Sequence, residues 1–145
     1  MEMLFQVLAA AVATAAFSLL FNAPAREYPF CAAAGGFCWL LYLLGEGWGY
    51  SPAFSSFLAA AALCALCRLF SILRRTPVTV FLIPGIFPIV PGAGIYYTAY
   101  HLFMGDMPAF SAKGLETGMT AAAIALGILL VLALPLPRRH SAPRR

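Results

Sequence analysis

The chain has 145 residues, of which 63% are hydrophobic and 10% are charged, and its formal net charge is +4. A soluble domain of this length could not bury so much apolar surface in its core, so the composition excludes the soluble protein classes. Lipid is the other environment that accepts apolar side chains, and the sequence therefore predicts an integral membrane protein.

Four segments have the length of a transmembrane helix, which needs about 20 apolar residues. They cover residues 3–21, 28–44, 53–73 and 114–134. A fifth segment, residues 77–104, is equally apolar, but four prolines and three glycines interrupt it: Pro77, Pro84, Pro88, Pro91, Gly85, Gly92 and Gly94. The side on which the C-terminus lies depends on whether this segment crosses the bilayer.

The distribution of arginines decides the topology, because Lys and Arg accumulate in short cytoplasmic loops. If residues 77–104 cross, an outside N-terminus places Arg26, Arg74, Arg75 and the basic tail 138–145 in the cytoplasm. If the segment dips in and returns, the tail lies on the opposite side from Arg74 and Arg75. Basic residues would then lie on both sides of the membrane, which disfavours this topology. We therefore predict one transmembrane domain, residues 1–145, built as an all-α bundle of five spans with the N-terminus out and the C-terminus in.

This sidedness also accounts for the positive net charge, since a basic residue beside an anionic cytoplasmic leaflet gains about 1 kcal/mol. We expect a multi-pass protein of the cytoplasmic membrane with no nucleic-acid partner. A cleaved signal peptide is disfavoured because no basic residue precedes the first span. Alanine-rich stretches in the first, third and fifth spans predict close helix packing, with partner helices in this chain, in a second copy or in another protein.

Four cysteines lie inside predicted spans: Cys31, Cys38, Cys64 and Cys67. The last two form a C-x-x-C pair, but no histidine accompanies them and no soluble βαβ context surrounds them. We interpret all four as small apolar packing residues and expect no metal and no cofactor. A membrane enzyme is disfavoured because no span carries His, Asp and Glu at the spacing of a catalytic or metal site.

The interrupted segment is the most informative part of the sequence. Each proline removes a backbone donor and clashes with the carbonyl four residues earlier, so residues 84–94 cannot form a straight helix. Two half-helices, residues 77–83 and 92–104, would cover the bilayer with the unwound residues near its middle. Many secondary transporters build substrate sites from such half-helices, with a positive N-terminal end facing an anionic group. The alternative is a proline kink that only shapes packing.

Three features together resemble the small subunit of the split threonine/serine exporter family. They are the run PGIFPIVPGAGIYYT from Pro84 to Thr98, the sequence Phe21-Asn22-Ala23-Pro24, and a third span that ends in paired arginines. The resemblance covers about residues 5–134. It implies a secondary exporter of threonine and serine that works with a larger membrane subunit. Some members of the family are associated with export of dicarboxylates such as succinate, so the resemblance leaves this substrate class open. A non-transporting scaffold, which needs only the small-residue packing faces, is the other alternative.

The substrate pathway predicted from this combination comprises residues at the break and others outside it. Asn22 either caps a helix or faces the pathway. Arg68 lies inside the third span, where it either snorkels to the interface or attracts a substrate carboxylate. The full predicted set is Pro84, Gly85, Pro88, Pro91, Gly92, Gly94, Tyr97, Thr98, Asn22 and Arg68.

Two further residues are candidates for proton coupling. His101 lies four residues after Tyr97, hence on the same helix face, and histidine titrates in the range that proton coupling needs. The alternative for the aromatic residues here is an interfacial belt. Glu116 lies near the boundary of the last span, three residues after Lys113, so a surface ion pair is its alternative role.

Overall fold

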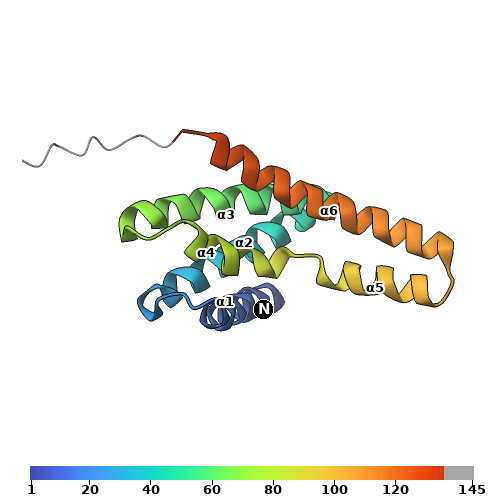
Figure 1. Cartoon of the computed structure of the whole chain (residues 1–145), viewed down its shortest axis with the longest axis horizontal. Helices are drawn as coiled ribbons and strands as arrows, with labels where there is room; N and C mark the ends of the chain where they lie inside the picture. Colours follow the sequence, from blue (N-terminus) through green and yellow to red (C-terminus); the bar gives the residue numbers. More distant parts are fainter. Residues whose placement is uncertain (136–145) are drawn as a thin grey trace, which may run out of the picture.

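The computed structural model describes residues 1–135, and within them every regular element is a helix. The prediction of an all-α fold is therefore confirmed. The predicted basic tail, residues 138–145, lies outside the described residues. In chain order the elements are α1 (Glu2–Leu20), η1 (Ala25–Glu27), α2 (Tyr28–Gly47), α3 (Pro52–Arg74), α4 (Thr79–Ile86), η2 (Phe87–Ile89), α5 (Gly92–Phe103) and α6 (Met107–Ala133) (Figure 1).

The helices correspond to the five predicted spans of a multi-pass membrane protein. In the described part of the chain, four helices are long and apolar enough to cross a bilayer. The predicted fourth span is a pair of helices, Thr79–Ile89 and Gly92–Phe103, bent by 53°, and it brings the number of spans to five if the pair crosses as one.

Consecutive spans run in opposite directions. Gly45 near the end of α2 lies against Ser55 near the start of α3, for example, and Gly94 near the start of α5 lies against Thr117. By contrast, α3 and α6 run parallel, since Cys64 lies against Ile128 and Arg68 against Val131. Which end faces the cytoplasm stays a prediction.

The last helix begins at Met107 rather than at residue 114, so the connection between the fourth and fifth predicted spans is shorter than the predicted bounds imply. Asp106 caps this helix by accepting a hydrogen bond from the Ala109 N–H at 3.1 Å, and a proline occupies its first turn. Both are ordinary signals of a helix start. The polar residues of the first turns had concealed the helix because they interrupt its apolar pattern.

The break in the fourth span is also narrower than predicted. Residues 84–91 were expected to be unwound, but α4 continues through Pro84 and η2 follows it directly. Only Val90 and Pro91 leave the helical conformation, with ψ values of 127° and 58°. The chain therefore changes direction over two residues just before α5.

The core lies where α2, α3 and α4 meet. Its fully buried members are mostly small, and they include all four cysteines as well as Leu63 and Phe81. Close approach of the backbones depends on glycine at two crossings. A Cβ on Gly127 would lie 2.6 Å from the Phe57 carbonyl oxygen, and one on Gly35 would lie 1.9 Å from the Thr14 hydroxyl oxygen. The predicted close packing of small residues thus finds partners within this chain.

The two halves of the broken span have different neighbours. The first half, α4, packs against α1, α2 and α3, whereas α5 packs against α6. None of the residues of α5, all of which the structure describes, is buried. Figure 1 shows α5 and the first turns of α6 extending together beyond the other helices.

Candidate functional site

The break in the fourth span lines a cavity of about 260 Å³, which we call the break pocket. Four elements contribute its walls: α2, α3, the connection from η2 to α5, and α6. Its lining residues are Trp39, Tyr42, Pro52, Ser56, residues 88–94, Lys113, Glu116, Thr117 and Thr120. The stacked rings of Trp39 and Tyr42, with centroids 5.1 Å apart, form one wall.

Five of the predicted site residues meet in this pocket: Pro88, Pro91, Gly92, Gly94 and Glu116. The two glycines differ in their surroundings. A Cβ on Gly94 would lie 2.5 Å from the Thr117 hydroxyl oxygen, so this glycine permits the crossing of α5 and α6. No atom of the described residues would lie within 4 Å of a Cβ on Gly92, which faces open space.

The N-terminus of α5 opens on the pocket through residues 92–94. No side chain within residues 1–135 caps this terminus. The first amide groups of a helix have no partner inside the helix, and the helix dipole gives this end a partial positive charge. Here the Gly92 N–H donates to the Val90 carbonyl at 2.7 Å, so the following amides are the ones that face a ligand. This end of the pocket therefore favours an anionic group.

The polar side chains of the pocket come from α2, α3 and α6. On α2, the Tyr42 hydroxyl donates to Glu46 Oε1 at 2.7 Å. On α6, Lys113 Nζ and Glu116 Oε2 are 2.9 Å apart, and both side chains are partly exposed. The hydroxyls of Thr117 and Thr120 donate to carbonyl oxygens of their own helix. On α3, Ser56 is only 1% exposed, and its hydroxyl has no hydrogen-bond partner among residues 1–135. Ser56 was not among the residues predicted from sequence, and a serine pair within an apolar span was the one available signal.

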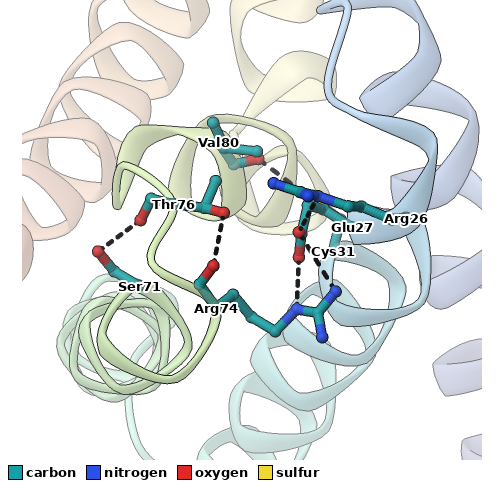
Figure 2. A network of polar contacts seen from close by, with 7 residues as sticks. All are labelled: Arg26, Glu27, Cys31, Ser71, Arg74, Thr76 and Val80. Atoms are coloured by element: carbon teal, nitrogen blue, oxygen red, sulfur yellow. Dashed lines mark hydrogen bonds and ion pairs between the residues drawn. The ribbon is translucent and has the colours of Figure 1, made fainter.

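A buried carboxylate organises the opposite end of the bundle (Figure 2). Glu27, in η1, is fully buried, and its two oxygens pair with Arg26 Nε and Arg74 Nε, each at 3.0 Å. The Arg74 guanidinium also lies 4.5 Å above the ring of Phe30. This network joins the loop after α1 to the end of α3, so Arg26 and Arg74 share one end of the molecule. Glu27 was not predicted from sequence, where the adjacent Arg26 was the only local signal.

Comparison with known proteins shows which family the sequence matches. Residues 6–134 match the family described as "Threonine/Serine exporter, ThrE". The chain belongs to this family. A probable threonine/serine exporter of Mycobacterium tuberculosis (strain ATCC 25618 / H37Rv) is 28% identical over 146 aligned residues, which cover 99% of this chain and 27% of that relative. The chain thus spans about a quarter of the length of the curated relative that it matches. No solved structure matches the chain.

In this threonine/serine exporter family member, the Cys31 thiol makes a hydrogen bond as well as packing contacts. Pro84 lacks an N–H, so it leaves the carbonyl of Val80, four residues earlier in α4, without its helical donor. The Cys31 thiol on α2 donates to that carbonyl at 3.4 Å (Figure 2). This contact gives the Val80 carbonyl a donor in place of the N–H that Pro84 lacks. Within residues 1–135 no group of three or more His, Cys, Asp or Glu side chains could hold a metal ion.

The predicted residues at the Glu27 end are Asn22, Pro84 and Arg68. Asn22 and Pro84 line a separate cavity of about 180 Å³ between α1 and α4. Asn22 adopts a left-handed conformation with φ of 52°, and its N–H donates to the Leu19 carbonyl, so it ends α1 through its backbone. Arg68 donates instead to the carbonyls of Val131 and Leu134 at the end of α6 and does not reach the break pocket.

The remaining predicted residues of this exporter-family chain lie outside the lining of the break pocket, most of them on α5. Tyr97 is 50% exposed, and the Thr98 hydroxyl donates to the Gly94 carbonyl at 2.7 Å. His101 Nδ1 lies 3.8 Å from Asp106 Oδ2, near the turn into α6. Gly85 lies inside α4, packed against Leu63 and Ala34. The structure therefore brings Glu116, but not His101, to the break.

Proposed function

We propose that the chain is a membrane subunit of a secondary transporter that exports small amino acids, threonine and serine, across the cytoplasmic membrane. The observation that carries the proposal is the break pocket, a small partly polar cavity that the interrupted span lines in a member of an exporter family. Irregular backbone at membrane depth is tolerated where it lines a cavity. Half-helix ends of this kind hold substrates in several secondary transporters.

The size and charge of the pocket support a small polar substrate. Its volume of about 260 Å³ is below the roughly 300 to 1,000 Å³ of pockets that hold drug-sized molecules. The uncapped N-terminus of α5 and Lys113 supply positive charge for a carboxylate. A carboxylate is common to amino acids and to dicarboxylates such as succinate, so both belong in the test.

We propose further that a larger membrane subunit completes the transporter. Two observations support this. The chain covers 27% of its longer relative, which is named a probable threonine/serine exporter. In addition, α5 leaves all of its residues at least partly exposed, although its other face packs against α6. Many alternating-access transporters pair two structural repeats around a central site. Five spans are few for a complete transporter of this kind, so a second subunit would supply the remaining helices.

Efflux from intact cells tests the proposal. Cells that carry the gene at its chromosomal position, and therefore keep any partner subunit, are compared with deletion cells after preloading with threonine, serine or succinate. We expect the deletion to slow threonine and serine efflux and the reintroduced gene to restore it. Unchanged efflux of all three compounds would overturn the proposed function, and an effect on succinate alone would favour the dicarboxylate alternative.

A pair of glycine variants then tests the pathway. A Cβ added at Gly92 or at Gly118 would have no described atom within 4 Å, but only Gly92 lines the break pocket. We expect Gly92→Leu to fill the pocket and lower efflux at least tenfold, with Gly118→Leu close to wild type at equal protein levels in the membrane. If both variants export normally, the scaffold alternative gains support.

A further inference from the structure

The break pocket presents one cationic and one anionic side chain next to each other. Lys113 and Glu116 lie three residues apart on α6, and both line the pocket beside residues 92–94 at the start of α5. Their contact is partly exposed, with side-chain exposures of 35% and 55%. An exposed pair of this kind contributes less than about 1 kcal/mol, so a ligand that offers both charges can replace it at little cost.

Ser56 supplies an independent observation at the same place. Ser56 lines the pocket, and its hydroxyl is buried and has no hydrogen-bond partner in the described part of the chain. A buried hydroxyl without a partner costs about 1 to 3 kcal/mol, which a ligand that completes the hydrogen bond would recover. Ser55 is equally buried and also unpartnered in that region, but it packs against Gly45 and does not line the pocket.

We infer that the break pocket binds a short hydroxylated amino acid as a zwitterion and that Ser56 is the residue that recognises the substrate hydroxyl. The carboxylate lies at the N-terminus of α5 beside Lys113, the ammonium group pairs with Glu116, and the side-chain hydroxyl exchanges a hydrogen bond with Ser56. This inference rests on the proposed function and deepens it. A dicarboxylate is disfavoured because its second negative charge would lie against Glu116.

The arrangement predicts a specific kind of selectivity. A site that forms a hydrogen bond with a substrate hydroxyl discriminates against the analogue that lacks it, because the buried protein group then stays unpaired. Threonine and 2-aminobutyrate form such a pair, since they differ only in the hydroxyl. We expect the wild-type protein to export threonine faster than 2-aminobutyrate.

The test compares Ser56→Ala with Ser55→Ala, each introduced at the chromosomal position, and measures efflux of both compounds. Each substitution removes an unpartnered buried hydroxyl, so neither is expected to lower the amount of protein in the membrane. We expect Ser56→Ala to lower the ratio of threonine to 2-aminobutyrate efflux roughly three- to tenfold, as the loss of one hydrogen bond implies. Ser55→Ala should leave this ratio at the wild-type value.

A second variant pair tests the ammonium contact. Glu116→Gln is expected to slow efflux of threonine and 2-aminobutyrate by the same factor, whereas Glu2→Gln makes the same charge change on α1, away from the break pocket, and should leave both rates unchanged. If wild-type cells export neither compound, the proposed function itself fails. If they export threonine, but Ser56→Ala keeps the ratio and Glu116→Gln keeps the rate, the exporter function stands and this assignment of the pocket is overturned.

Discussion

The two halves of the broken span come from one continuous apolar sequence, yet they meet different surroundings. In α4, Phe81, Leu82, Pro84 and Gly85 are buried among α1, α2 and α3. In α5, which the structure describes in full, no residue is buried, and the helix packs along α6. Hydropathy predicted that both halves lie in the membrane, but it could not predict which half would be buried by the other helices.

This difference separates the roles of the two ends of the molecule. The α4 end is fixed by a dense core and by the Glu27 network, so substitutions there should act mainly on stability. The α5 end combines the break pocket with exposed helix faces, so substitutions there should act mainly on transport. Variants at each end can test this division, beginning with the largest expected effect.

The largest loss of stability is expected at the α4 end, for Arg74→Gln. The substitution leaves the fully buried carboxylate of Glu27 with only the exposed Arg26 as a partner, and an uncompensated buried charge costs about 3 kcal/mol. Thermal unfolding of the purified protein in detergent measures the effect. Arg75→Gln is the matched control, because Arg75 is the exposed neighbour at the end of α3.

A double variant shows whether the buried charge causes this loss. Because Glu27→Gln removes the charge that needs a partner, the variant with both substitutions should be more stable than Arg74→Gln alone. If Arg74→Gln unfolds at the same temperature as Arg75→Gln, the network does not fix the α4 end and the proposed division is wrong.

The spans and the approximate position of the break followed from sequence because both depend on local features, namely apolar length and the positions of proline. Three features did not follow. The donor to the Val80 carbonyl, which Pro84 leaves without a helical partner, is Cys31, a residue of another helix. The burial of Glu27 depends on Arg74, from the end of α3, and the burial of Ser56 depends on how α3 packs. Local patterns carry no information about such partners, whereas the early start of α6 was signalled by Asp106 and Pro108.

At the α5 end, Gly94→Ala and Gly92→Ala should separate packing from transport. A methyl group on Gly94 meets Thr117 at 2.5 Å, and overpacking of this kind costs about 1 to 3 kcal/mol. Gly92→Ala adds the same methyl group in open space, so the unfolding temperature should stay the same while threonine efflux falls. Adding Thr117→Ala to Gly94→Ala removes the obstructing atoms and should restore stability. Equal stability of the two single variants would contradict the crossing of α5 and α6 at Gly94.

The smallest effect concerns the hydrogen bond that Cys31 donates to the Val80 carbonyl, four residues before Pro84. Cys31→Ala removes the donor to the Val80 carbonyl, and we expect a loss of about 1 kcal/mol in the free energy of unfolding. Cys67→Ala is the control for lost volume, because Cys67 is equally buried and its thiol makes no hydrogen bond among residues 1–135. Cys31→Ser keeps a donor and should be more stable than Cys31→Ala. If the two alanine variants lose the same free energy, the thiol contributes only packing, and the continuity of α4 must come from its burial against α2 and α3.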